Sequence, residues 1–290
     1  MSGADAVEAG YARCLAETRR RAANFGLGIR LLPRERRRAL SAVYWFSQRA
    51  DDAADGDGPP GERRFRLETV RTELDRTLAG DPPSSSWAAL ADASSRFRIA
   101  HGLYRELLDG VGRDLDPSPY PDWGATLAYC YGVAGTVGLI SLPIFGVDEA
   151  DGENARRDAI DLGAALQITN ILRDLREDAR RGRWYLPLDL SDRYGVHPEG
   201  VAAGRPGPGF EALVLAAAET ARPLYGAARR LSARLPRSTR ACPVSLAAVY
   251  RGLLERIAAD PAAVLRERVR VPGPAKAARA FGASLIALAR

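Results

Sequence analysis

Gln167 to Pro187 reads QITNILRDLREDARRGRWYLP, and four of its polar residues recur at regular intervals. Gln167, Asn170, Asp174 and Asp178 follow one another at intervals of three, four and four residues. In a helix of ~3.6 residues per turn, such spacing places all four side chains on one face. The remaining faces are apolar and carry Ala164, Leu166, Ile168, Ile171, Leu172 and Leu175. A helix that is apolar on several sides belongs at the centre of a bundle, so we predict that its polar stripe lines an internal cavity.

A second acidic cluster, Asp51-Asp52-Ala53-Ala54-Asp55, repeats the four-residue spacing of Asp174 and Asp178. Each cluster offers two carboxylates about one helical turn apart. Two such pairs facing each other would hold Mg²⁺, which keeps part of its water shell and binds best where carboxylates meet substrate phosphates. The bound ions would neutralise a diphosphate and make it a good leaving group. The two clusters therefore predict a magnesium-dependent enzyme that acts on a diphosphate.

The rest of the chain indicates an all-α protein. At 290 residues with 46% hydrophobic content, the chain can fill a substantial core. No segment alternates apolar and polar residues over enough positions to predict a strand. No strong boundary divides it, so we expect residues 1–290 to form one domain. A helix starts near Tyr11, and after a pause at Asn24 to Pro33 further helices are expected over residues 34–55, 62–78, 87–108, 123–145, 154–180, 210–235, 244–259 and 274–288. Residues 187–209 are expected to be looser because glycine and proline are frequent there.

Charge and composition exclude several classes of function. The net charge is +6, but the arginines lie in short blocks beside helical segments, a pattern that does not predict nucleic-acid binding. Cys14, Cys130 and Cys242 lack the spacing of a disulfide framework or a zinc site, which fits a cytoplasmic protein. No GxGxxG follows a predicted strand, so no nicotinamide site is evident. The acidic start and the absence of an unbroken apolar run of ~18 residues indicate a protein that is soluble or bound peripherally to a membrane.

Ionisation of an allylic diphosphate gives a carbocation, which needs a dry cavity with apolar and aromatic walls. The candidates to line such a cavity are Phe25, Tyr44, Phe46, Tyr129 and Tyr131. The small residues between Gly132 and Gly138 permit two interpretations: tight helix packing, or space for a bulky ligand.

Several segments together resemble the squalene/phytoene synthase family. They are DDAAD, the segment YCYGVAGTVG from Tyr129 to Gly138, and QITNILRDLREDARRGRWYLP. NFGLGIRLLP at Asn24 to Pro33 and VYRGLLERI at Val249 to Ile257 are similar in the same order. The likeness covers nearly the whole chain, and paired DxxxD motifs with NILRD before the second are more specific than one DxxxD alone.

The resemblance implies a helical isoprenoid-synthase bundle with a central cavity, and head-to-head condensation of two allylic prenyl diphosphates through a cyclopropylcarbinyl diphosphate to a C30 or C40 product. It implies two or three Mg²⁺ ions held by Asp51, Asp55, Asn170, Asp174 and Asp178. Tyr129 would take part with these aspartates in catalysis. The substrate-binding positions are Asn24, Phe25, Tyr44, Gln48, Arg49, Gln167, Asn170, Arg173 and Tyr185. The greasy product is consistent with peripheral membrane contact, whereas prenyl chain length is not readable from the sequence.

One departure from the family pattern keeps an alternative open. The family commonly has arginine three residues before the first aspartate, where this chain has Gln48 with Arg49 beside it. Glutamine lacks the charge and the fork of donors that suit phosphate, and Ala22, Ala23, Gly26 and Leu27 also depart from common family residues. One diphosphate site would then be weakened, and the same fold would transfer a single prenyl group to an aromatic acceptor. A third interpretation, a helical scaffold with acidic surface patches, predicts that changing these aspartates is harmless.

Overall fold

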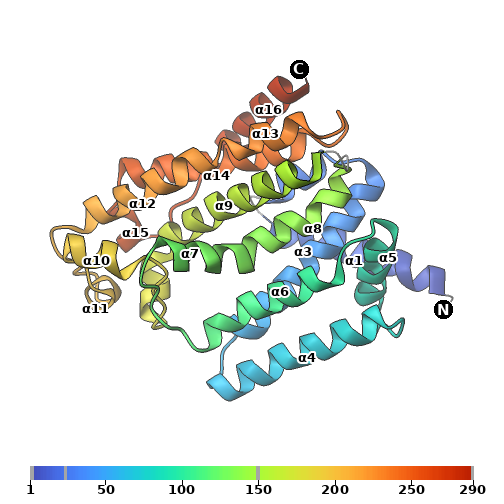
Figure 1. Ribbon diagram of the computed structural model, residues 1–290, viewed down its shortest axis with the longest axis horizontal. Helices are drawn as coiled ribbons and strands as arrows, with labels where there is room; N and C mark the ends of the chain where they lie inside the picture. The colour runs from blue at the N-terminus through green and yellow to red at the C-terminus, as the bar shows by residue number, and fades with distance from the viewer. Residues whose placement is uncertain (1–2, 23–24, 148–150, 289–290) are drawn as a thin grey trace.

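The computed structural model describes residues 3–22, 25–147 and 151–288, and its regular elements are all helical (Figure 1). The elements of the first half are α1 Gly3–Arg21, α2 Phe25–Arg30, α3 Arg34–Asp55, α4 Pro60–Leu78, α5 Ser85–Arg96, α6 His101–Gly112, η1 Arg113–Leu115, α7 Trp123–Cys130, η2 Tyr131–Gly135 and α8 Thr136–Phe145. Those of the second half are α9 Gly152–Arg180, α10 Leu188–Tyr194, α11 Pro198–Ala202, α12 Phe210–Leu224, α13 Ala227–Ala233, α14 Ala241–Ala259, α15 Ala263–Arg266 and α16 Gly273–Leu288. The all-α prediction is confirmed.

Helix α9 lies at the centre of the bundle. It runs beside α8 through the middle of Figure 1, with α12 to α14 and α16 above and α3, α6 and α4 below. It contacts α7, α8, α11, α12, α13, α14 and α15. Ala165, Ile168 and Leu172 are fully buried on it, whereas Gln167 and Asn170 keep partial exposure. The prediction of a buried central helix with a polar stripe is therefore confirmed.

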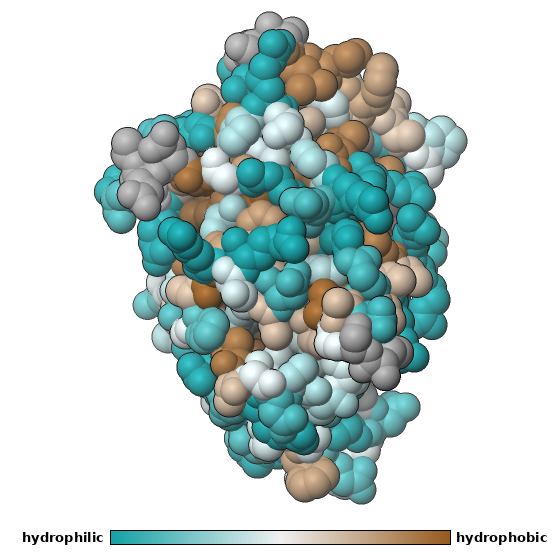
Figure 2. All heavy atoms as spheres, turned by 90° about the vertical axis from the view of Figure 1, so that its right-hand side faces the viewer, coloured by the Kyte–Doolittle hydropathy of each residue, from teal (hydrophilic) through white to brown (hydrophobic). Residues whose placement is uncertain are grey.

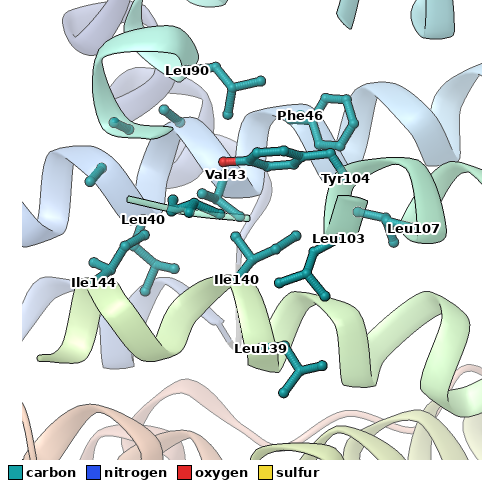
Figure 3. Close-up of a cluster of buried hydrophobic side chains, with 14 of the residues drawn as sticks. Leu40, Val43, Phe46, Leu90, Leu103, Tyr104, Leu107, Leu139, Ile140 and Ile144 are labelled. Carbon is teal, nitrogen blue, oxygen red and sulfur yellow. The ribbon is translucent and has the colours of Figure 1, made fainter. Parts of the chain in front are cut away.

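Two apolar clusters form the core on either side of this centre. One joins α3, α5, α6 and α8, where Leu40, Phe46, Tyr104 and Ile140 interlock (Figure 3). The other joins α9 to α12, α13 and α14. Partly buried Phe25 and Val133 pack against both clusters, so the two halves of the core are continuous.

Glycines bring the central helices close together. A Cβ added at Gly138 of α8 would lie 2.8 Å from the Ala159 carbonyl oxygen of α9, and one at Gly163 would lie 2.9 Å from the Ala134 carbonyl carbon. Gly110 and Gly132 make a similar approach between α6 and η2. Gly138 and Gly163 also line the cavity described below. The small residues between Gly132 and Gly138 therefore serve both tight helix packing and the space of the cavity.

Some predicted helices differ from those observed. The expected helix over residues 87–108 is two helices, because the chain turns at Phe97 to Ala100 and Arg98 adopts a positive φ of 51°. The expected pause before Pro33 contains α2, and the loose region over 187–209 contains α10 and α11. The helix over 210–235 breaks after Leu224 into α12, which contains Pro223, and α13.

One helical stretch among the described residues, Trp123–Phe145, is long and apolar enough to cross a membrane by length and composition alone. It is a longer apolar span than the sequence led us to expect. It comprises α7, the π-helical turn η2 and α8, and it packs on α9, α6 and α3. About half of the apolar window is buried in this way.

Candidate functional site

A cavity of about 880 Å³ lies between α3, α7, α8, α9 and α14. Its lining changes character along its length, because α3 and α9 both carry their aspartates near their C-terminal ends. Asp51, Asp55, Asp174 and Asp178 line the polar end. The opposite end is lined by Leu40, Phe145, Ala159, Leu231 and Cys242. The cavity thus combines a charged mouth with a greasy interior.

The two predicted aspartate pairs do converge at this mouth. Asp55 accepts a hydrogen bond from Arg183, which follows α9 and so ties its end to the end of α3. Electrostatic coupling joins Asp178 to Asp174, Asp114 and Asp55. Sequence spacing alone predicted that each pair shares a helix face, and the bundle brings the two faces together.

Burial and the charges of neighbouring carboxylates make one aspartate of each pair, Asp51 and Asp178, hard to ionise. Burial raises the pKa of Asp51 to about 7, and the charges of Asp55, Asp114 and Asp52 add to the rise. Asp51 keeps partial exposure because one side of it faces the cavity, and protein surrounds it on the other sides. Burial likewise raises the pKa of Asp178 to about 7, with Asp174 contributing. A cation that entered this cluster would stabilise the ionised form of its carboxylates.

Asp174 differs from its partner because two arginines hold it. Burial tends to raise its pKa, but hydrogen bonds from Arg173 and Arg268 outweigh that effect and lower it. Arg268 donates to the two carboxylate oxygens over 2.9 and 3.1 Å, and Arg173 binds the same carboxylate from the adjacent position. Arg268 belongs to the extended segment after α15 and was not anticipated from the sequence.

Asp114 in η1 is a further acidic group that the sequence analysis missed. Its carboxylate accepts hydrogen bonds from the hydroxyls of Tyr185 at 2.8 Å and Tyr129 at 3.1 Å. Burial raises the pKa of Asp114 to about 6, an effect that Arg183 and the Tyr185 bond oppose. Burial also raises the pKa of Tyr129 well above its usual value, so this hydroxyl stays protonated. No repeat or spacing marks Asp114, since it comes from a three-residue helix.

The tyrosines near Asp114 form an aromatic wall. The rings of Tyr129 and Tyr185 stack with centroids 4.7 Å apart, and Tyr120 packs against both. On another wall, Phe25 and Tyr44 stack at 5.9 Å. These faces can stabilise a cation in the cavity.

Three predicted residues lie elsewhere. Phe46 is fully buried between Trp87 and Tyr104, and the Tyr131 hydroxyl donates to Glu106 at 2.6 Å. Arg49 follows Gln48 by one residue, which turns it ~100° around α3. It therefore faces α4, where its guanidinium donates to Glu73 at 2.7 Å.

Arg49 is thus removed from the candidate substrate-binding residues. Asn24 lies outside the described residues. The other candidates do border the cavity: Phe25, Tyr44, Gln48, Gln167, Asn170, Arg173 and Tyr185.

Additional cations surround the mouth. Arg21 of α1 borders the cavity and forms a two-pronged pair with Asp52 over 2.5 and 2.6 Å. Arg183 is only 5% exposed, and Lys276 of α16 also reaches the cavity lining. Arg183 lies within the quoted segment GRWYLP, so the sequence did hold a signal for it. Arg21 and Lys276 come from helices that are distant in the sequence, and no sequence motif marked either residue as part of the site.

The donor set fits magnesium. Asn170 Oδ1 is buried and has no hydrogen-bond partner in the described chain, which leaves one neutral oxygen ligand beside the carboxylates. Gln48 donates to Asp51 at 3.2 Å and orients its carboxylate. Within the described ranges, no three acidic, histidine or cysteine side chains are close enough to enclose an ion by themselves. Carboxylate and amide oxygens are the protein ligands that Mg²⁺ takes, beside water and phosphate oxygens.

Comparison with known proteins gives consistent results. A family model described as squalene/phytoene synthase matches residues 18–275. The chain is 40% identical over 275 residues to the phytoene synthase of Mycobacterium tuberculosis, which covers 93% of this chain and 89% of that protein. It is 33% identical over 279 residues to the 15-cis-phytoene synthase of Synechocystis, covering 93% and 83% of the two chains.

Solved structures share the fold. A dehydrosqualene synthase crystallised with a ligand superposes with a TM-score of 0.89 at 25% identity, covering 100% of both chains. The squalene synthase HpnC from Alicyclobacillus acidocaldarius gives a TM-score of 0.77 at 25% identity, covering 87% of this chain and 94% of that one.

Proposed function

The chain belongs to the squalene/phytoene synthase family of prenyltransferases, and from this premise we propose that it joins two geranylgeranyl diphosphates head to head into a C40 product. Magnesium dependence and a cyclopropylcarbinyl diphosphate intermediate are part of the proposal. The curated relatives at 33 to 40% identity are named phytoene synthases, which supports the C40 product over a C30 one. We also propose that residues 1–290 act as one domain, since Phe25 and Val133 pack against both core clusters.

The convergence of two aspartate pairs on one end of an otherwise apolar cavity carries this proposal. A prenyl diphosphate has the same polarity, with a charged head and a long hydrocarbon tail. Its head would lie among Asp51, Asp55, Asp174 and Asp178, and its tail would extend toward Leu40 and Phe145. When bound, Mg²⁺ supplies charge neutralisation and Lewis acidity toward the leaving diphosphate.

The arginines at the mouth bind and orient the diphosphate. Arg173, Arg183 and Arg268 each hold a site carboxylate and present further N–H donors in a fork that matches phosphate oxygens. Lys276 adds a point charge. Asn170 offers its unpartnered oxygen to an ion, and Gln167 accepts a hydrogen bond from the Asn170 amide at 3.4 Å.

The cavity walls protect the carbocation once diphosphate has left. Val133, Val137, Leu162, Leu166 and Leu246 exclude water along the tail. Near the head, the stacked rings of Tyr129 and Tyr185 present π faces, and their hydroxyls are both held by Asp114. Protonated Tyr129 thus sits beside a carboxyl group that can accept or return a proton, as elimination to a hydrocarbon requires.

Transfer of one prenyl group to an aromatic acceptor is the second candidate, favoured by Gln48. Gln48 lines the cavity where the family commonly has arginine. However, Arg21 stands at the same end of the cavity and supplies a guanidinium there. The site therefore has cationic side chains for two diphosphates even with Gln48 in place of arginine. We retain head-to-head condensation as the main proposal.

Product analysis tests the proposal. Purified protein with Mg²⁺ and geranylgeranyl diphosphate alone should give phytoene or a prephytoene-type diphosphate by liquid chromatography and mass spectrometry. Farnesyl diphosphate offered in competition measures chain-length preference. Turnover only after an aromatic acceptor is added would replace the main proposal with the second. In that case Gln48→Arg should restore the head-to-head product, whereas no effect of Gln48→Arg would remove Gln48 from the explanation.

A further inference from the structure

The outer face of α16 exposes large apolar side chains. Phe281 is 66% exposed, Leu285 52%, Ile286 60% and Leu288 41%. Phe281, Leu285 and Leu288 follow at intervals of four and three residues and so form one stripe along the helix. Hydrophobic residues gather at the top of the face shown in Figure 2, the end of the molecule at which Figure 1 places α16.

The side of α16 that packs on α14 is made of small residues. Ala280, Ser284 and Ala287 are buried there. Ser245 of α14 donates or accepts a hydrogen bond with the Ser284 hydroxyl at 2.8 Å and bonds to the Ala280 carbonyl at 3.2 Å. A helix on the surface of a soluble protein ordinarily turns its large apolar residues inward. Here the arrangement is reversed, so folding does not account for the large residues.

Cations border this stripe. Helix α16 contains the exposed Arg279 and no acidic residue, and its Lys276 borders the cavity. Arg237 donates to the Leu288 carbonyl at 2.8 Å, and Arg30 ends α2, which also contacts α16. Both arginines are exposed, and neither forms an ion pair with an acidic side chain in the described chain. Glu255 of α14 lies within electrostatic reach of Arg279 but is already held by Arg222 at 3.0 Å.

We propose that the outer face of α16 docks on the surface of an anionic lipid bilayer. Phe281, Leu285, Ile286 and Leu288 would enter the boundary between head groups and acyl chains, while Arg30 and Arg237 meet anionic head groups. Leu31 is 43% exposed and directly follows α2, which contacts α16. This inference goes beyond the proposed reaction and does not depend on it.

A second copy of the chain fits this surface less well. A two-fold contact through α16 would bring the arginines of both copies together, and like charges repel. The exposed large apolar residues of α16 also number only four, whereas a stable interface uses about 20–30 residues a side. The charge and the narrowness of the stripe both favour a lipid surface.

Co-sedimentation of the full chain with vesicles, without magnesium or substrate, tests the docking surface. Vesicles of equal parts phosphatidylglycerol and phosphatidylcholine should bind the protein about tenfold better than pure phosphatidylcholine. Raising NaCl from about 0.1 to about 0.5 M should weaken that binding. The double variant Phe281→Gln/Leu285→Gln should lower binding by about tenfold or more, because two apolar side chains no longer leave water.

A matched control changes exposed apolar residues elsewhere. Phe65 of α4 and Leu215 of α12 are 73% and 40% exposed, and Phe65→Gln/Leu215→Gln should bind vesicles like the parent. Equal losses in both double variants, or no loss in the α16 variant, would overturn the proposal. So would a parent that dimerises in solution through α16 and does not bind vesicles. Thermal unfolding of each variant separates these outcomes from misfolding.

Discussion

Asp178 lowers the folding stability of the metal-free protein when its carboxylate is ionised. Its carboxylate is buried next to Asp174, and its pKa is raised to about 7. An ionised group at this position costs folding free energy in the metal-free protein, and that cost is recovered only when a cation arrives.

Replacement of Asp178 by asparagine should therefore have opposite effects on activity and stability. Under the proposed function, Asp178→Asn should reduce turnover by at least about a hundredfold, since a proposed magnesium ligand that stabilises the leaving group is lost. At pH 8 the metal-free variant should be more stable than the parent by about 1–3 kcal/mol. Steady-state kinetics and urea unfolding measure the two effects. Asp57→Asn, in the exposed loop after the first cluster, is the control and should change neither.

At the residue level, sequence spacing predicted that each aspartate pair shares a helix face, whereas some of the residues around the pairs were not predicted. The i, i+4 rule places Asp51 with Asp55 and Asp174 with Asp178 without knowledge of the fold. Arg49 was misplaced because adjacency in sequence means ~100° of rotation on a helix. Asp114 and Arg268 reach the site from other elements, and only the assembled bundle brings them there.

Close packing between α9 and the π-helical turn η2, which leads into α8, depends on glycine at a single position. Gly163 meets the backbone of Ala134 and Gly135, where an added Cβ would lie 2.9 Å from three backbone atoms. Backbone cannot move aside as a flexible side chain can. The helices would have to separate, and the cavity between them would change shape.

Gly163→Ala should destabilise the protein by about 1–3 kcal/mol, although alanine favours a helix by ~1 kcal/mol over glycine. Gly102→Ala in α6 provides the comparison, because its added Cβ would meet no atom of another described element within 4 Å. That variant should be neutral or stabilised by up to about 1 kcal/mol. Chemical denaturation measures both, and equal effects of the two changes would contradict a packing role for Gly163.

At the level of elements, long periodic helices were predictable and their interruptions were not. Helix α3 begins and ends as expected, and α9 differs only at its start. The break between α5 and α6 at Phe97 to Ala100 carries no glycine or proline, so no local signal revealed it. The π-helical turn η2 lies inside an expected continuous helix, and an irregular turn of this kind depends on tertiary packing rather than on local propensity.

The molecule as a whole should respond to pH through its acidic cluster. Burial raises the pKa values of Asp51 and Asp178 to about 7 and of Asp114 to about 6, above the ordinary 3.8. Between about pH 4 and 7 the folded state therefore binds more protons than the unfolded state, and stability falls as pH rises. The lowered pKa of Asp174 acts in the opposite sense, and its contribution is lost below about pH 4.

The metal-free protein should consequently be more stable at pH 5 than at pH 8, by on the order of a few kcal/mol. Thermal unfolding across this range measures the loss. Magnesium with inorganic pyrophosphate should raise the unfolding temperature more at pH 8 than at pH 5, because binding requires ionised carboxylates. A midpoint that climbs steadily from pH 5 to pH 8 without ligand would contradict the shifted pKa values.

The pairing of Arg268 with Asp174 spans 94 residues of chain. Translation at about 5–20 residues per second produces the aspartate roughly 5–20 seconds before its arginine. A nascent chain on the ribosome therefore already holds both acidic motifs while it still lacks one of the guanidinium groups that balance them. The acidic site reaches its final charge arrangement only after Arg268 has been synthesised.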